Sequence, residues 1–197
     1  MKNRTWISGL ASIITLSTLL VVAPVTLSAN DNSLPPQSVY NLQVAVEDQL
    51  GEITGLDRYK GQPVLVTMFY TSCPHVCPML ISTIKLTESK LSVEERARLR
   101  VLTISIDPER DTPENLHQVF QRHSVDSGRW SMVRPKPGDV RKIAGVLGIK
   151  YKQLPDGEFS HTTRIILLDR DGIQVASTDQ LGRPDAVFLE AIRTSLQ

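Results

Sequence analysis

The sequence predicts an α/β fold with a central mixed sheet, flanking helices and an N-terminal β-hairpin. Residues 63–70 ("PVLVTMFY") and 100–106 ("RVLTISI") are almost continuously apolar, which is typical of strands buried on both faces. A helix is predicted after each strand, at 78–90 and at 113–122, the second with Thr112 as N-cap and proline in its first turn. Strands that alternate with helices in this way form parallel sheets.

The remaining predicted elements complete a mixed sheet. A short strand is expected at 130–133, and a helix at 137–147 that ends at Gly148. Strands at 163–168 and 173–176 surround the turn "DRDG" and form an antiparallel tail before a closing helix at 184–196. Upstream, segments 42–46 and 52–54 around Gly51 predict the hairpin.

The first 29 residues predict export from the cytoplasm. Lys2 and Arg4 precede an uncharged apolar run at 7–27, which is long enough for a signal peptide or for a membrane span of ~20 residues. The sequence "LSA" at 27–29 is a passable cleavage site, so a cleaved signal peptide and a retained anchor both fit. Both place the remainder of the chain outside the cytoplasm.

The rest of the chain suits a polar tether and one domain. Residues 30–38 ("NDNSLPPQS") are expected to form the tether, and residues 39–197 a single domain of ordinary size. The chain has 22 basic and 21 acidic residues, without a basic cluster. A nucleic-acid-binding function is therefore excluded, because it needs a concentrated basic surface.

The chain has two cysteines, Cys73 and Cys77, in "SCPHVCP". A structural disulfide is the default in an oxidising compartment, but closing so small a loop would stabilise the fold little. Proline after each cysteine predicts a loop, with the helix starting at Pro78 and its N-terminus favouring a thiolate at Cys77. Thiolates act as metal ligands, nucleophiles or disulfide partners, and the loop by itself leaves these three roles open.

Two thiolates suit soft Cu(I), and they also suit Zn, although less exclusively. Because two sulfurs do not fill the coordination sphere of either ion, a metal site would need a third ligand. His161 is favoured, since it stands directly before a late strand from which it could reach the cysteine loop. His117 is expected to face solvent, and His123 to complement the negative end of a helix. His75 lies within the loop and is expected to point outward, although a contribution to the site is left open.

Four further side chains have simpler interpretations. Asp107 either orients a ligand or forms a turn before proline. Asp111 is expected to support the start of the helix at Thr112. Met68 and Met79 are soft sulfur donors near the loop, but methionine at such positions usually packs in the core.

Three features together resemble the Sco/SenC family: "TSCPHVCP", then "SIDPERDTP", then a lone histidine at the start of a late strand. The resemblance covers nearly the whole chain after the tether. It implies a thioredoxin-like fold and copper, as Cu(I), Cu(II) or both, bound by Cys73, Cys77 and His161. It implies a metallochaperone rather than an enzyme, with thiol–disulfide oxidoreductase activity as an additional possibility.

The resemblance also implies partners and a location. The partner is the copper-site subunit of cytochrome c oxidase, whose dinuclear copper centre would be assembled. A thiol reductant of the thioredoxin class is expected as a second partner, because thiols outside the cytoplasm would otherwise oxidise. The location would be periplasmic, with a membrane contact through the N-terminal segment if it is retained. Two departures are present: Ser160 replaces a common acidic residue, and residues 68–70 replace a glycine-containing strand end. Such changes would weaken copper binding or favour thiol chemistry.

Three other functions compete with copper delivery. An extracytoplasmic thiol–disulfide reductase would use Cys73 to attack and Cys77 to resolve, with His161 dispensable. A peroxidase is disfavoured, because no Thr and Arg constellation is evident around Cys73. A purely structural binding module is disfavoured by the spacing of the cysteines and the histidine around one end of the sheet.

Overall fold

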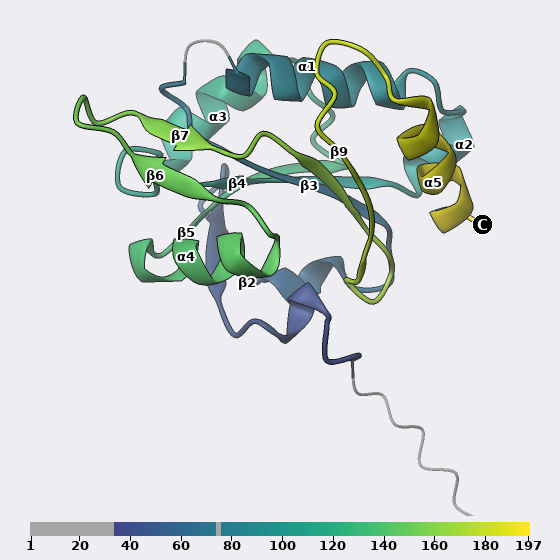
Figure 1. The fold of residues 1–197 in the computed structure, drawn as a ribbon, viewed down its shortest axis with the longest axis horizontal. Coiled ribbons are helices and arrows are strands. Elements are labelled where there is room, and N and C mark those ends of the chain that lie inside the picture. The colour runs from purple at the N-terminus through teal and green to yellow at the C-terminus, as the bar shows by residue number, and fades with distance from the viewer. Residues whose placement is uncertain (1–33, 74–75) are drawn as a thin grey trace, which may run out of the picture. The chain divides into compact units, whose positions relative to one another are not determined.

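A seven-stranded mixed sheet forms the centre of the fold, in the order β2-β1-β5-β4-β3-β8-β9 (Figure 1). Its strands are β1 (Ala45–Asp48), β2 (Ile53–Gly55), β3 (Val64–Phe69), β4 (Arg100–Ser105), β5 (Trp130–Pro135), β8 (Ile165–Leu168) and β9 (Gln174–Thr178). Strands β3, β4 and β5 are parallel, and the other pairs are antiparallel. The predicted mixed sheet and N-terminal hairpin are confirmed.

The computed structural model describes residues 34–73 and 76–197. The predicted signal peptide or anchor, residues 30–33 of the tether, and His75 lie outside the described residues. No helix in the described ranges is long and apolar enough to cross a membrane. Ser38, at the end of the predicted tether, is buried, and its hydroxyl donates a hydrogen bond to the Asp171 carbonyl oxygen at 2.5 Å.

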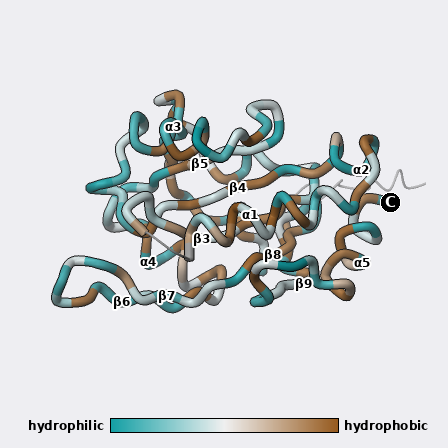
Figure 2. Tube along the Cα trace, turned by 90° about the horizontal axis from the view of Figure 1, so that it is seen from above, coloured by the Kyte–Doolittle hydropathy of each residue, from teal (hydrophilic) through white to brown (hydrophobic). Residues whose placement is uncertain are grey.

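The central strands explain why the apolar runs predicted the sheet correctly. Every residue of β3 is buried, and β3 lies between β4 and β8, whose hydrophobic residues are visible in Figure 2. The register pairs Val64 with Arg100 and Phe69 with Ser105, so β3 and β4 end at the same edge of the sheet. Residues that follow these two strands are therefore neighbours.

Helices cover both faces of the sheet (Figure 1). In that view α1 and α3 lie above the sheet, whereas α4 lies below it. The helices are α1 (Val76–Glu88), α2 (Val93–Ala97), α3 (Pro113–Arg122), α4 (Pro137–Val146) and α5 (Ala186–Ser195), with 3-10 turns η1 (Val39–Asn41) and η2 (Leu56–Tyr59).

Most helix boundaries follow the local signals in the sequence. The Thr112 hydroxyl accepts a hydrogen bond from the Asn115 amide at 3.3 Å and caps α3, as predicted. The short helix α2 was not predicted, although Ser92 and Glu95 form a capping box at its start. Helix α1 begins at Val76, two residues before the predicted start.

A second hairpin, which the sequence analysis missed, carries the favoured histidine. Strands β6 (Tyr151–Gln153) and β7 (Phe159–His161) pair only with each other among the described residues and form a separate two-stranded sheet. Each strand has three residues, too few for a clear alternation of apolar and polar positions. The Pro-Asp-Gly sequence at 155–157 is a turn signal that could have revealed the hairpin.

Gly172 provides a test of how closely the N-terminal segment packs on the domain. Its φ is +78°, and an added Cβ would lie 2.6 Å from the Tyr40 ring. Gly172→Ala is therefore expected to lower the free energy of unfolding by about 2–4 kcal/mol, through the left-handed backbone and overpacking. Urea titration measures this, with Gly182→Ala as a matched control of the same φ and no atom within 4 Å of its Cβ. Equal losses in the two variants would contradict close packing of Tyr40.

Candidate functional site

The candidate site lies where the parallel strands β3 and β4 end. The Ile106 amide donates a hydrogen bond to the Phe69 carbonyl oxygen at 2.8 Å, which holds the two strand ends together. The cysteine loop begins after β3, and the Asp107–Asp111 turn begins after β4. Sites in α/β sheets occur at this carboxyl edge, because the loops that leave neighbouring strands meet there.

The two cysteines are neighbours at the start of α1. Cys73 is 9% exposed and Cys77 is 3% exposed, and both are thiols. The Cys77 amide lies 3.4 Å from the Cys73 sulfur and donates a hydrogen bond to it. The Tyr70 amide donates to the Cys77 sulfur at 3.5 Å. Backbone amides of one loop and one helix start therefore hold both sulfurs in place.

The prediction of a thiolate at Cys77 is wrong. Because α1 begins at Val76, Cys77 lies within the first turn and its side chain is buried. Burial raises the pKa of the Cys77 thiol well above its usual value, and the hydrogen bond from the Tyr70 amide offsets this only in part. The amide of Cys77, in the first turn of α1, instead donates a hydrogen bond to the sulfur of Cys73.

Asp111 fastens the cysteine loop to the end of β4. Its fully buried carboxylate accepts hydrogen bonds from the Thr71 amide at 3.0 Å, from the Thr71 hydroxyl, and from the Ser105 hydroxyl. The expected role at the start of α3 is wrong, because this carboxylate binds donors in the cysteine loop and in β4 and the side chain that caps α3 is that of Thr112. Burial raises the pKa of the Asp111 carboxyl, although its hydrogen bonds partly oppose this.

His161 is held as a neutral imidazole with one nitrogen available. Its Nδ1 lies 3.1 Å from the Thr162 carbonyl oxygen, which can only accept, so Nδ1 carries the hydrogen and Nε2 has the lone pair. Burial lowers the pKa of the His161 imidazole, and the bond to Thr162 raises it by less. A neutral imidazole with a bare Nε2 is the form that binds metals.

Tyr70 connects the cysteines to His161. Its ring packs edge-on against the His161 ring, with centroids 6.1 Å apart, while its amide binds the Cys77 sulfur. Its hydroxyl donates to the Phe159 carbonyl oxygen at 3.3 Å. Within residues 34–73 and 76–197, no three His, Cys, Asp or Glu side chains lie close enough to hold a metal ion. The structure thus brings the two cysteines together, whereas His161 is in contact with the ring of Tyr70.

Asp107 forms a turn, which was one of its two predicted roles. Its carbonyl oxygen accepts hydrogen bonds from the amides of Arg110 and Asp111, and its carboxylate binds the Arg110 guanidinium. Arg110 also reaches the β6–β7 hairpin, where the Gly157 carbonyl oxygen accepts a hydrogen bond at 2.7 Å. Sequence analysis did not single out Arg110.

The remaining histidines and the two methionines near the loop differ in their burial and in their distance from the cysteines. His123 lines a cavity of about 30 Å³ together with both cysteines, so it lies nearer to the site than its predicted role at the end of α3 suggested. His117 is half-buried and contacts Gln121. Met68 is fully buried, as predicted for packing, whereas Met79 is 44% exposed.

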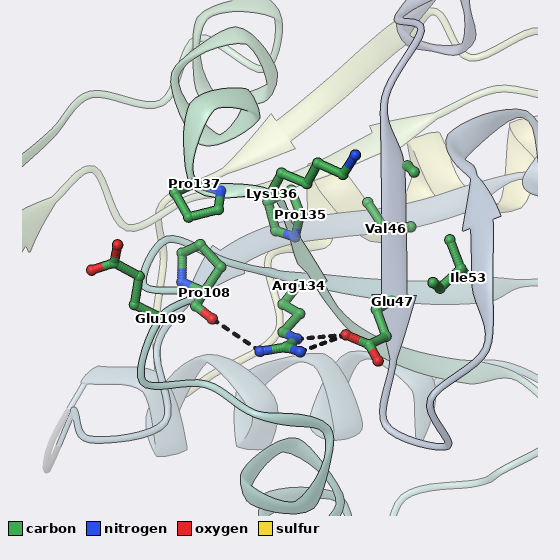
Figure 3. Close-up of a pocket in the computed structure, with 10 residues that line it drawn as sticks. Val46, Glu47, Ile53, Pro108, Glu109, Arg134, Pro135, Lys136 and Pro137 are labelled. Carbon is green, nitrogen blue, oxygen red and sulfur yellow. Dashed lines mark hydrogen bonds and ion pairs between the residues drawn. The ribbon is translucent and has the colours of Figure 1, made fainter.

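A larger groove of about 320 Å³ has neither cysteine in its lining (Figure 3 shows the lining residues). It lies between the β1–β2 hairpin and the end of β5, and its lining includes Ile53 and Pro135. Arg134 points across it but is bound by Glu47 at 2.6 Å and by the Pro108 carbonyl oxygen at 3.3 Å. The Arg134 guanidinium in the groove is thus already paired with groups of the protein. For this reason we place the candidate site at the cysteines and not in the groove.

Comparison with known proteins identifies relatives of this chain. A family model described as SCO1/SenC matches residues 38–197. The "SCO1 protein homolog" of Bacillus subtilis is 25% identical over 129 residues, which are 64% of this chain and 66% of that protein. The mitochondrial "Protein SCO1 homolog" of Homo sapiens is 31% identical over 120 residues, 58% of this chain and 39% of that protein.

Solved structures are similar in fold. ScoI of Bradyrhizobium japonicum, solved with copper bound, has a TM-score of 0.58 and 29% identity, covering 77% of this chain and 94% of that chain. A SCO1/SenC family lipoprotein of Bacillus anthracis has a TM-score of 0.71 and 21% identity, covering 80% and 96%. The predicted thioredoxin-like fold is confirmed by these neighbours.

Proposed function

Because the chain belongs to the SCO1/SenC family, we propose that it is a copper metallochaperone that binds copper through Cys73, Cys77 and His161. The observation that carries the proposal is the pair of adjacent buried sulfurs, joined through Tyr70 to an imidazole with a bare Nε2. Two thiolates and an imidazole suit Cu(I). Copper-bound structures of Sco proteins support copper as the metal.

Copper binding would require a rearrangement that brings His161 and the sulfurs together, and the loss of protons from the thiols. Ligating cysteines lose their protons on binding, and burial makes the Cys77 thiol hold its proton strongly, so the approaching cation must supply the driving force. The Tyr70 ring packs against the His161 ring while the Tyr70 amide binds the Cys77 sulfur, and a shift of this ring would accompany the approach of the imidazole. A three-coordinate site of this kind releases its ion to a recipient by exchange of ligands.

Similar proteins support a recipient and a location for the proposed function. A Bacillus protein of similar fold belongs to the Sco family of cytochrome c oxidase assembly proteins, which supports the copper-site subunit of that oxidase as the recipient. A related lipoprotein supports action at the outer face of the membrane, and hence an extracytoplasmic location. In such a compartment the thiols need a reductant of the thioredoxin class before copper can bind.

A thiol–disulfide reductase is the second candidate function. The proximity of the two sulfurs fits a dithiol that closes into a disulfide, and a disulfide switch has been identified in the related Bacillus protein. In this function Cys73 would attack a partner disulfide, and Cys77 would resolve the mixed disulfide and leave the partner's cysteines reduced. His161 would have no part in either step.

Titration of the reduced full-length chain with Cu(I), against a chromophoric competitor, separates these functions. We expect one copper per chain, loss of stoichiometric binding in Cys73→Ser and Cys77→Ser, and at least about tenfold weaker binding in His161→Ala. His123→Ala is the matched control, because that imidazole also lies near the sulfurs but is not a proposed ligand. A wild-type chain without bound copper would contradict the chaperone, and disulfide reduction that is unaffected in His161→Ala would support the reductase.

A further inference from the structure

We propose that Arg110 positions His161 for copper, because it links the β6–β7 hairpin to the turn after β4. The contacts of Arg110 with Asp107 on one side and with the hairpin on the other are called the clasp. The inference rests on the proposed function and deepens it, because it assigns a positioning residue to the metal site. Arg110 belongs to the turn at the carboxyl edge of the sheet, and His161 belongs to the hairpin. Their connection therefore links the hairpin to the edge that also carries the cysteines.

Arg110 contacts three consecutive residues of the hairpin. Its Nη2 donates a hydrogen bond to the Gly157 carbonyl oxygen at 2.7 Å, and its Nη1 lies 3.5 Å from the Glu158 carboxylate. The guanidinium carbon lies 5.9 Å from the centre of the Phe159 ring, within the range of a cation–π contact. Phe159 and His161 are the two ends of β7, so the clasp acts directly on the strand that holds the imidazole.

The other end of the clasp is fixed. The Arg110 Nε binds the carboxylate of Asp107, whose side chain is only 8% exposed. The Asp107 amide in turn donates to the Ser105 hydroxyl at 2.9 Å, and its carbonyl oxygen accepts from the Arg110 amide at 3.1 Å. The guanidinium is thus anchored at the end of β4 before it reaches across to the hairpin.

The hairpin needs such an anchor. Strands β6 and β7 pair with each other and with no strand of the seven-stranded sheet. A lone two-stranded hairpin is marginally stable in water, so its placement depends on side-chain contacts. Tyr70 also contacts the hairpin, because its ring lies 5.5 Å from the Phe159 ring and its hydroxyl donates to the Phe159 carbonyl oxygen. Tyr70 and Arg110 hold the same residue, and Arg110 also reaches Gly157 and Glu158.

The test uses the full-length chain with Arg110→Ala, Arg110→Lys and the control Arg98→Ala. Lysine keeps the charge but lacks the planar fork that contacts Asp107 and Gly157 together. Arg98 is the exposed C-cap residue of α2, and α2 lies on the opposite side of the molecule from β6 and β7 in Figure 1 and Figure 2. The control therefore removes an arginine without touching the hairpin.

Amide hydrogen exchange of the metal-free protein tests the clasp without any reference to copper. We expect exchange at 157–161 to be about tenfold faster in Arg110→Ala than in the wild type, with β3 and β4 unchanged, because local opening reports local contacts. Arg110→Lys should be intermediate and Arg98→Ala unchanged. Equal exchange in the hairpin of the wild type and Arg110→Ala would overturn the clasp.

Competition for Cu(I) tests whether the contacts of Arg110 increase the affinity for copper. We expect about tenfold weaker binding in Arg110→Ala, with one copper per chain retained, as for other residues that orient a ligand. In a His161→Ala background, Arg110→Ala should cause no further loss, because its effect passes through the imidazole. Additive losses would overturn the inference. A wild-type chain that binds no copper would refute the proposed function, and the exchange experiment would then decide the clasp alone.

Discussion

Replacing Glu88 by alanine is expected to lower the free energy of unfolding by about 3–5 kcal/mol, the usual loss when a buried ion pair is broken from one side. Glu88 is 5% exposed at the end of α1. Its carboxylate accepts hydrogen bonds from the Arg129 guanidinium and, at 3.1 Å, from the Trp130 indole. Removal of the carboxylate would leave a largely buried charge and a buried indole N–H without this acceptor.

Urea unfolding followed by circular dichroism measures the loss. Glu88→Gln should be less harmful than Glu88→Ala, because its amide oxygen still accepts from Trp130 while the charge attraction to Arg129 is lost. Glu190→Ala is the control, since its 72% exposed carboxylate faces Arg193 at 3.8 Å and such surface pairs contribute little. A loss in Glu88→Ala no larger than that of the control would show that the buried pair does not stabilise the fold.

Asp111→Ala is expected to cost about 3 kcal/mol and to loosen the cysteine loop, because the half-buried Thr71 and the buried Ser105 lose their acceptor. Asp111→Asn should cost clearly less, since an amide oxygen can accept from Thr71 and the amide group can donate to Ser105. Thermal unfolding gives the stability, and the rate of Cys73 alkylation by iodoacetamide reports loosening of the loop. Slow alkylation of both variants, as in the wild type, would contradict the fastening role.

The difference in stability between the wild type and Asp111→Asn is expected to depend on pH. Burial raises the Asp111 pKa above its ordinary value of 3.8, so the folded state takes up a proton at higher pH than the unfolded state. As pH falls from above the raised pKa towards 3.8, the wild type gains stability relative to Asp111→Asn, which does not titrate there. Below 3.8 both states are protonated and the difference becomes constant. Unfolding free energies of both proteins across this interval measure the effect, and a difference that moves the other way would contradict the raised pKa.

The framework of the fold can be predicted from the sequence. The apolar runs predicted β3 and β4 because strands buried on both faces consist mainly of apolar residues, and the buried threonines Thr67 and Thr103 donate hydrogen bonds to carbonyl oxygens. Thr112 and Gly148 marked helix ends correctly, because capping and positive φ depend on local chemistry. The cysteine pair and the family resemblance also needed only the order of the residues, and the family match over 38–197 agrees with them.

The tertiary structure alone decided how the site is held. The charge state of Cys77 was mispredicted, because burial depends on what packs around the thiol and not on the proline that follows it. Asp111 binds Thr71, forty residues earlier, and the β6–β7 hairpin is placed by Arg110 and Tyr70. These contacts join segments that are distant along the chain, and no local pattern encodes them. The role of His161 as a copper ligand remains the proposal that the titration tests.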